Sequence, residues 1–256
     1  MYTMGLDIGS TTSKGVIMKD GKEIVASVLV PVGTGTSGPL KLIKELKEKS
    51  NLTENDIEKT VVTGYGRMQY KADKQISELS CHAKGVAFLI PSARTIIDIG
   101  GQDAKAMKLN DKGKLMNFIM NDKCAAGTGR FLDVMSGVLE TDVSKLGEIS
   151  EKSTKEVSIS STCTVFAESE VISHLSANAK KEDIVAGIHT SVVRRVSTLA
   201  MRVGIEDEVV MVGGVARNKG IVKAMEREIG HNIKVPELAQ LTGALGAAIY
   251  AFEETK

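Results

Sequence analysis

The stretch GLDIGSTTSK, residues 5–14, runs from an apolar strand through Asp7 into a turn rich in glycine and hydroxyl side chains. Such a turn exposes backbone N–H groups that no side chain covers, so phosphate oxygens can approach them closely. The carboxylate of Asp7 does not bind phosphate itself, but it can hold Mg²⁺ or water bound to Mg²⁺. We therefore expect a phosphate site here, with contacts from Gly9, Ser10, Thr11, Thr12 and Lys14.

The same pattern occurs a second time along the chain. Asp98-Ile99-Gly100 is followed by Lys105, at the seven-residue offset that separates Asp7 from Lys14. Each copy follows an apolar strand and leads into a predicted β-hairpin, the first with an Asp20-Gly21 turn. Two copies of one α/β unit predict two lobes that face each other, with a ligand in the cleft between them.

Hydrophobic periodicity predicts the remaining elements. The expected strands are 3–8, 15–18, 24–30, 60–63, 95–99, 104–109, 115–120 and 209–212. The expected helices are 40–49, 78–89, 129–139, 165–177, 184–203, 219–229 and 238–253.

The second turn and a third glycine turn extend the predicted nucleotide site. Asp98 is the second carboxylate expected on the Mg²⁺ side, and Gln102 or Asp103 is expected to orient or activate an attacking water. The third turn, 213–218, follows a buried strand, and its glycines would let the backbone lie flat against an adenosine. The expected contacts in these two turns are Gly100, Gly101, Gln102, Gly213, Gly214, Ala216 and Asn218.

In order, the three turns resemble the phosphate-1, phosphate-2 and adenosine motifs of the acetate/sugar kinase–Hsp70–actin superfamily. The resemblance implies a duplicated ribonuclease-H-like α/β fold of two lobes, with ATP in the cleft between them. We expect the first lobe to comprise 1–92 with a returning helix at 240–256, and the second to comprise 93–239. The 256 residues leave little room for the sugar-binding insertions of many kinases and none for a chaperone's peptide-binding domain.

Two of the three cysteines lie close to predicted helices. Cys124 falls between a strand and a helix, and Cys163 falls just before a helix, so we expect both thiols at helix N-termini, where the macrodipole lowers a thiol pKa. Two ligands per chain do not complete a Cys₄ site, whereas a two-fold homodimer does. On position alone, a buried structural cysteine and a zinc site are alternatives. Cys81 is expected to be structural.

The sequences around these cysteines distinguish between a cluster ligand, a zinc ligand and a structural cysteine. KCAAGTG, residues 123–129, and CTVFAESE, residues 163–170, closely resemble the activators (component A) of 2-hydroxyacyl-CoA dehydratases, which are relatives of the benzoyl-CoA reductase ATPase subunits. The resemblance covers essentially the whole chain. It implies one [4Fe-4S] cluster held by Cys124 and Cys163 of each subunit of a homodimer. It also implies binding of ATP or ADP with Mg²⁺, and we include Gly127 and Gly129 among the cofactor-binding residues.

The function implied by the resemblance is ATP-dependent one-electron reduction. An activator of this kind takes an electron from ferredoxin or flavodoxin and uses ATP hydrolysis to drive it into the dehydratase. One rival interpretation is a small-molecule kinase of the same superfamily. Another is a non-enzymatic nucleotide switch, either chaperone-like or filament-forming.

Composition excludes some partners. The net charge of +1, with no basic stripe, argues against nucleic acid. No apolar run reaches the roughly 18 residues of a membrane span, and no signal peptide is recognisable, so we expect a cytoplasmic protein.

Overall fold

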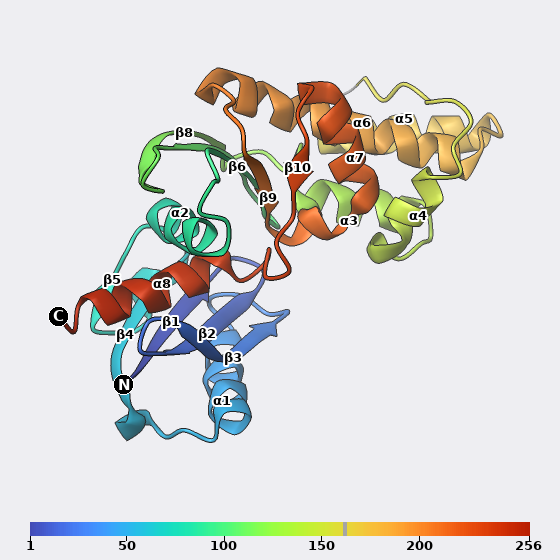
Figure 1. Ribbon diagram of the computed structural model, residues 1–256. Coiled ribbons are helices and arrows are strands. Elements are labelled where there is room, and N and C mark those ends of the chain that lie inside the picture. Colours follow the sequence, from blue (N-terminus) through green and yellow to red (C-terminus); the bar gives the residue numbers. More distant parts are fainter. Residues whose placement is uncertain (161–162) are drawn as a thin grey trace. The chain divides into compact units, whose positions relative to one another are not determined.

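The computed structural model describes residues 1–160 and 163–256 (Figure 1). The chain forms two compact units. The first comprises residues 1–93, 109–116 and 236–256, and the second comprises 94–108 and 117–235. No helix in these described ranges is long and apolar enough to cross a membrane.

A five-stranded sheet of order β3-β2-β1-β4-β5 forms the centre of the first unit. Strand β1 pairs antiparallel with β2 and parallel with β4. The β2–β3 turn has positive φ at both Asp20 and Gly21, 53° and 64°, which matches the twist of a tight hairpin. The strands are β1 (Tyr2–Ile8), β2 (Ser13–Lys19), β3 (Glu23–Val30), β4 (Ile57–Thr63) and β5 (Lys74–Gln75).

Helices pack on both faces of this sheet, because successive side chains of β2 point to opposite faces. Ile17 packs with Leu42 and Leu46 of α1 (Gly38–Ser50), whereas Val16 packs with α8 (Thr242–Glu253). Helix α2 (Glu78–Leu89) lies against α8, and two 3-10 turns, Glu54–Asp56 and Arg67–Gln69, complete the unit.

The second sheet repeats this topology. Its order, β10-β9-β6-β7-β8, read in reverse matches the first: an antiparallel hairpin joined to the first strand, then a parallel pair. The strands are β6 (Thr95–Ile99), β7 (Ala104–Leu109), β8 (Leu115–Asn121), β9 (Val209–Val212) and β10 (Ile233–Lys234). The predicted duplication of one α/β unit is therefore confirmed.

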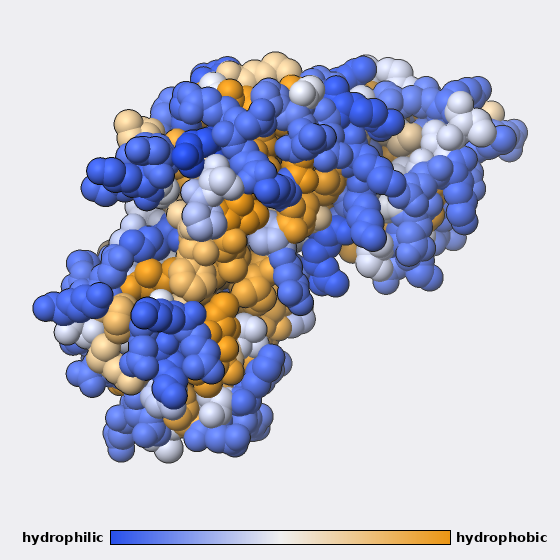
Figure 2. Space-filling view, viewed as in Figure 1, coloured by the Kyte–Doolittle hydropathy of each residue, from blue (hydrophilic) through white to orange (hydrophobic). Residues whose placement is uncertain are grey.

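Helices of the second unit carry an amphipathic pattern, and the sides of α6 and α7 that are visible in Figure 2 carry mainly hydrophilic residues. The helices are α3 (Gly129–Val138), α4 (Leu146–Ser150), α5 (Thr164–Ser176), α6 (Lys181–Val203) and α7 (Lys219–Ile229). Two 3-10 turns, Val143–Lys145 and Gly214–Arg217, accompany them.

All the predicted strands and helices form, with small shifts at their ends. The largest shift is in the last helix, which begins at Thr242 rather than at 238, because Pro236 and Leu238 accept turn hydrogen bonds from Ala239 and Leu241. Short elements escaped the prediction, among them α4, β5 and β10, since two to five residues carry too little periodicity to identify.

Glycines set the close approach of α8 to its neighbours. A Cβ on Gly246 would overlap the carbonyl of Cys81 on α2, and one on Gly85 would overlap the carbonyl of Thr242. A Cβ on Gly5 of β1 would in turn overlap the backbone of Ala244. Helix α8 is therefore held between α2 and β1 at backbone contact.

We predict that Gly246→Ala lowers the free energy of unfolding by about 2 kcal/mol or more, because the added methyl forces α2 and α8 apart. The matched control is Gly137→Ala in α3, where a Cβ meets no atom of the described residues within 4 Å. That change should raise the free energy of unfolding by about 0.5 kcal/mol through chain entropy. Urea unfolding of both variants measures the difference, and equal stability of the two would contradict this account.

Candidate functional site

The end of β1 carries a buried ion pair. Asp7 is 1% exposed and stands directly opposite Lys14 in the β1–β2 hairpin, which places both side chains on one face of the sheet. Lys14 Nζ lies 3.0 Å from Asp7 Oδ2, and the Gly9 N–H closes the turn by donating to the Thr12 carbonyl at 3.0 Å. In the described part of the chain, Asp7 Oδ1 is buried without a hydrogen-bond partner.

The end of β6 repeats the arrangement. Asp98 and Lys105 stand opposite each other in the β6–β7 register, and both are buried. Lys105 Nζ lies 3.3 Å from Asp98 Oδ2. Lys105 also contacts Asp103 Oδ2 at 2.7 Å, and the Gly100 N–H donates to the Asp103 carbonyl at 2.9 Å. The seven-residue offset in the sequence therefore arises because the acid and the lysine are cross-strand partners in two equivalent hairpins.

A glycine follows the parallel neighbour of each strand. Gly64, after β4, has φ 88°, and Gly213, after β9, has φ 87°. A Cβ on Gly64 would lie 2.5 Å from Asp7 Oδ1, and one on Gly213 would lie 2.5 Å from Asp98 Oδ1. The positive φ and the short contact each exclude a side chain at these positions. Each glycine therefore leaves free space beside one strand-end carboxylate. Gly64 was not among the predicted site residues, although its position after a buried strand matches that of Gly213.

Helix α3 is bonded directly to the second turn. The Gly129 N–H donates to the Gly100 carbonyl at 2.9 Å, and the Arg130 N–H donates to the Gly101 carbonyl at 2.8 Å. Gly127 and Gly129 were both predicted to bind the cofactor. Of these two, Gly129 lies against the second phosphate turn. Gly127 instead packs beside Arg195 of α6.

The third turn continues from β9 into helix α7. Gly214 opens the 3-10 turn that contains the buried Ala216. Asn218 then caps α7, because its Oδ1 accepts from the Ile221 N–H at 3.2 Å. The glycine-rich backbone and the capping amide thus lie on one continuous loop.

The three cysteines are free thiols in different environments. Cys81 is fully buried, and burial raises its pKa to about 12, in keeping with a structural role. Cys163 is exposed and is the N-cap residue of α5, as expected.

Cys124 is half-buried in the loop between β8 and α3. The expectation that Cys124 lies at the helix N-terminus is wrong, because the N-cap is Thr128. Asn121 holds the loop instead, donating through Nδ2 to the Cys124 carbonyl at 2.9 Å and to the Ala126 carbonyl at 3.1 Å.

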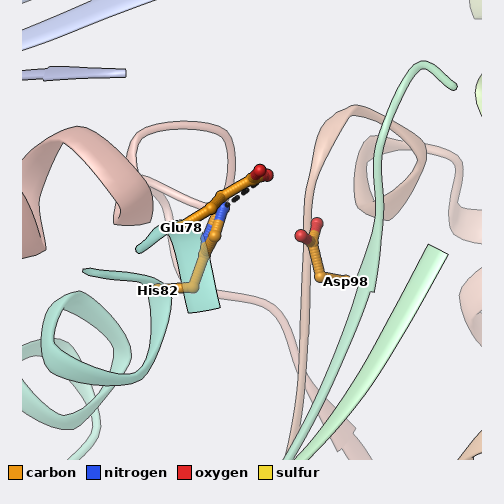
Figure 3. Close-up of side chains that lie close together, drawn as sticks. All are labelled: Glu78, His82 and Asp98. Carbon is orange, nitrogen blue, oxygen red and sulfur yellow. Dashed lines mark ion pairs between the residues drawn. The ribbon is translucent and has the colours of Figure 1, made fainter. Parts of the chain in front are cut away.

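A histidine to which the sequence gave no role lies near Asp7. On α2, His82 Nε2 and Glu78 Oε1 point toward each other at 3.6 Å (Figure 3). His82 Nδ1 lies 2.8 Å from Thr242 Oγ1 at the start of α8. A Cβ on Gly243 would lie 3.2 Å from His82 Nε2 and 3.0 Å from Asp7 Oδ2, so the start of α8 separates the two groups. Figure 3 also draws Asp98 on β6.

Comparison with known proteins gives matches along the full length of the chain. Residues 4–251 match the BadF/BadG/BcrA/BcrD ATPase family. The chain is 70% identical to the 2-hydroxyisocaproyl-CoA dehydratase activator of Clostridioides difficile over 257 residues, 100% of this chain and 97% of the relative. It is 59% identical to the (R)-2-hydroxyglutaryl-CoA dehydratase activating ATPase of Acidaminococcus fermentans over 256 residues, 99% of this chain and 98% of the relative.

A solved structure gives the same match in three dimensions. It is the activator of the 2-hydroxyisocaproyl-CoA dehydratase from Clostridium difficile with bound ADPNP. The TM-score is 0.97 at 70% sequence identity, over 99% of this chain and 95% of that one.

We predict that the three thiols of the metal-free protein react in the order of their exposure. Cys163 should be alkylated fastest and Cys124 more slowly, whereas Cys81 should stay unmodified until the chain unfolds, because a buried thiol with a raised pKa forms little thiolate. Peptide mass spectrometry after a time course with iodoacetamide measures the order. Labelling of Cys81 at the rate of Cys163 would contradict the packing of α2 against α8.

Proposed function

Because the chain belongs to the BadF/BadG/BcrA/BcrD ATPase family, we propose that it hydrolyses ATP to activate a 2-hydroxyacyl-CoA dehydratase by delivering one electron to it. The observation that carries this proposal is the full-length identity of 70% to the activator of one such dehydratase. Two strand-end carboxylates and two accessible thiols provide the groups that the chemistry requires.

The two carboxylates suit a Mg²⁺-bound nucleotide. Asp7 Oδ1 is buried without a hydrogen-bond partner in the described chain, and an unsatisfied buried carboxylate oxygen is costly. A Mg²⁺ ion or its bound water would satisfy it, while Lys14 holds the other oxygen. We assign Asp7 and Asp98 to the Mg²⁺ side. The turns that follow them would bind phosphate through Gly9, Ser10, Thr11, Thr12, Lys14, Gly100, Gly101 and Gln102.

The second turn also offers a group that can orient the attacking water. Asp103 is ion-paired with Lys105, which occupies its carboxylate, whereas the Gln102 side chain is exposed. Gln102 is therefore the better candidate for holding the water in line, and Asp103 keeps Lys105 in place. The adenosine would lie on Gly213, Gly214, Ala216 and Asn218.

The two thiols suit a shared cluster. Cys124 and Cys163 both lie outside the core, so two copies of the chain can contribute four thiolates to one [4Fe-4S] cluster. When bound, such a cluster supplies a one-electron couple. Val165 and Phe166 follow Cys163 and are 65% and 67% exposed, and exposed apolar side chains beside a ligand favour a protein contact at this place. Ferredoxin or flavodoxin would be the electron donor.

Coupling between the nucleotide and the thiols has a direct route in the second unit. The first N–H groups of α3 are bonded to the carbonyls of Gly100 and Gly101, and the loop of Cys124 leads into that helix. A shift of the phosphate turn therefore moves the start of α3 and with it the Cys124 loop.

We predict that protein purified without oxygen is brown, with about four irons per dimer, and that Cys124→Ala and Cys163→Ala are colourless because each removes two of four ligands. The matched control is Cys81→Ala, which removes a buried thiol and should keep the colour. Iron and sulfide analysis with a visible spectrum measures the outcome. Zinc in place of iron would indicate a structural site, and a metal-free wild type would favour the kinase interpretation.

We predict that Asp7→Ala and Asp98→Ala keep the colour but lose ATP turnover by about a hundredfold or more, since each removes a strand-end carboxylate from the Mg²⁺ side. Phosphate release from the iron-loaded variants measures the rate. Asp111→Ala, in the β7–β8 turn, is the control and should turn over ATP like the wild type. Unchanged turnover in both site variants would remove these carboxylates from the mechanism.

A further inference from the structure

Three elements of the second unit meet at the side chain of Asn218. Asn218 caps α7 through Oδ1, which accepts from the Ile221 N–H at 3.2 Å. Its amide nitrogen, Nδ2, lies 3.1 Å from Nε2 of His189 on α6. Gly147 of α4 approaches from a third side, where a Cβ would lie 2.9 Å from Asn218 Oδ1.

The hydrogen bonds fix which way the amide faces. Because the Ile221 N–H requires an acceptor, Asn218 presents its oxygen to α7 and its NH₂ group to His189. The imidazole therefore has to accept at Nε2, which only neutral histidine can do. Burial lowers the pKa of His189 to about 4, so the ring stays neutral at the pH of most cells.

The ring itself is held by close packing. A Cβ on Gly220, in the first turn of α7, would lie 2.9 Å from both Cε1 and Nδ1 of His189 and 2.5 Å from Ser150 Oγ. His189 is 2% exposed, so protein atoms surround the ring on almost all sides. The acceptor that faces Asn218 is thus fixed in position as well as in protonation state.

We propose that His189 is a positioning residue of the adenosine-binding loop: by accepting from the Asn218 amide, it fixes the end of the 213–218 turn in the conformation that binds an adenine nucleotide. This inference rests on the proposed function, which assigns that turn to the adenosine. His189 would not touch the nucleotide. Its effect would fall on the nucleoside part of the ligand, because the phosphate turns lie elsewhere in the chain.

Calorimetric titration of the wild type and variants with ADP, and separately with tripolyphosphate, tests the proposal. His189→Leu removes the acceptor and should raise the Kd for ADP about tenfold to a hundredfold, with the Kd for tripolyphosphate unchanged within about twofold. His189→Gln restores a carbonyl acceptor and should recover most of the ADP affinity. The matched control, Ser197→Ala, removes a buried hydroxyl that bonds locally on the same helix, and should bind ADP like the wild type.

A double-mutant cycle shows whether His189 acts through Asn218. Adding His189→Leu to Asn218→Ala should change the Kd for ADP by less than about twofold. If His189→Leu does not fold, His189→Ala replaces it in the titrations and in the cycle, since it also removes the acceptor that faces Asn218 and should show the same selective loss of ADP affinity.

Three results would overturn the proposal. They are unchanged ADP affinity in His189→Leu, an equal loss of ADP and tripolyphosphate affinity, and additive effects in the cycle. A wild type that binds tripolyphosphate but not ADP would instead remove the proposed function, and this inference with it.

Discussion

A buried carboxylate paired with a lysine across a hairpin is the constraint on which both units depend. Asp7 and Asp98 are almost completely buried at the ends of central strands, where an isolated charge would cost several kcal/mol. Lys14 and Lys105 compensate that cost only if the hairpin register places them opposite the acids, so the intervening turn must keep its length. The neighbouring parallel strand must then end in a glycine with positive φ, since a Cβ there would meet the carboxylate. The turn, the lysine and the glycine form one motif, which the chain contains twice.

Much of this was predictable from the sequence, because the motif is local. The offset between Asp7 and Lys14 recurs at Asp98, and a tight turn between alternating strands is a strong signal. Gly64 was missed because its role appears only when β4 is paired with β1, which is a contact between distant parts of the sequence. Cys124 was expected at the N-terminus of a helix and instead lies in the preceding loop, although the helix itself begins at Gly129 as predicted. The side chain of Asn121 organises the Cys124 loop, and no periodic pattern marks such a bond.

The partners of buried polar side chains could not be predicted from the sequence either. His82 and His189 lie on helices whose apolar pattern is clear from the sequence, but their partners, Thr242 and Asn218, come from other elements. A lone histidine on an apolar helix face gives no sign of what it contacts. Only the packing of α2 against α8, and of α6 against α7, reveals that one lies beside a strand-end carboxylate and the other behind the third glycine turn.

In the proposed function, nucleotide bound at the strand-end turns would control the Cys124 loop through α3. We propose that electron delivery depends on ATP hydrolysis and not on nucleotide binding alone. The most direct measurement mixes the reduced, iron-loaded protein with a 2-hydroxyacyl-CoA dehydratase and follows oxidation of the protein by stopped-flow absorbance. Rapid oxidation is expected with Mg²⁺ and ATP, and little oxidation is expected with Mg²⁺ and ADPNP. Oxidation at the same rate with both nucleotides, or with none, would contradict this proposal.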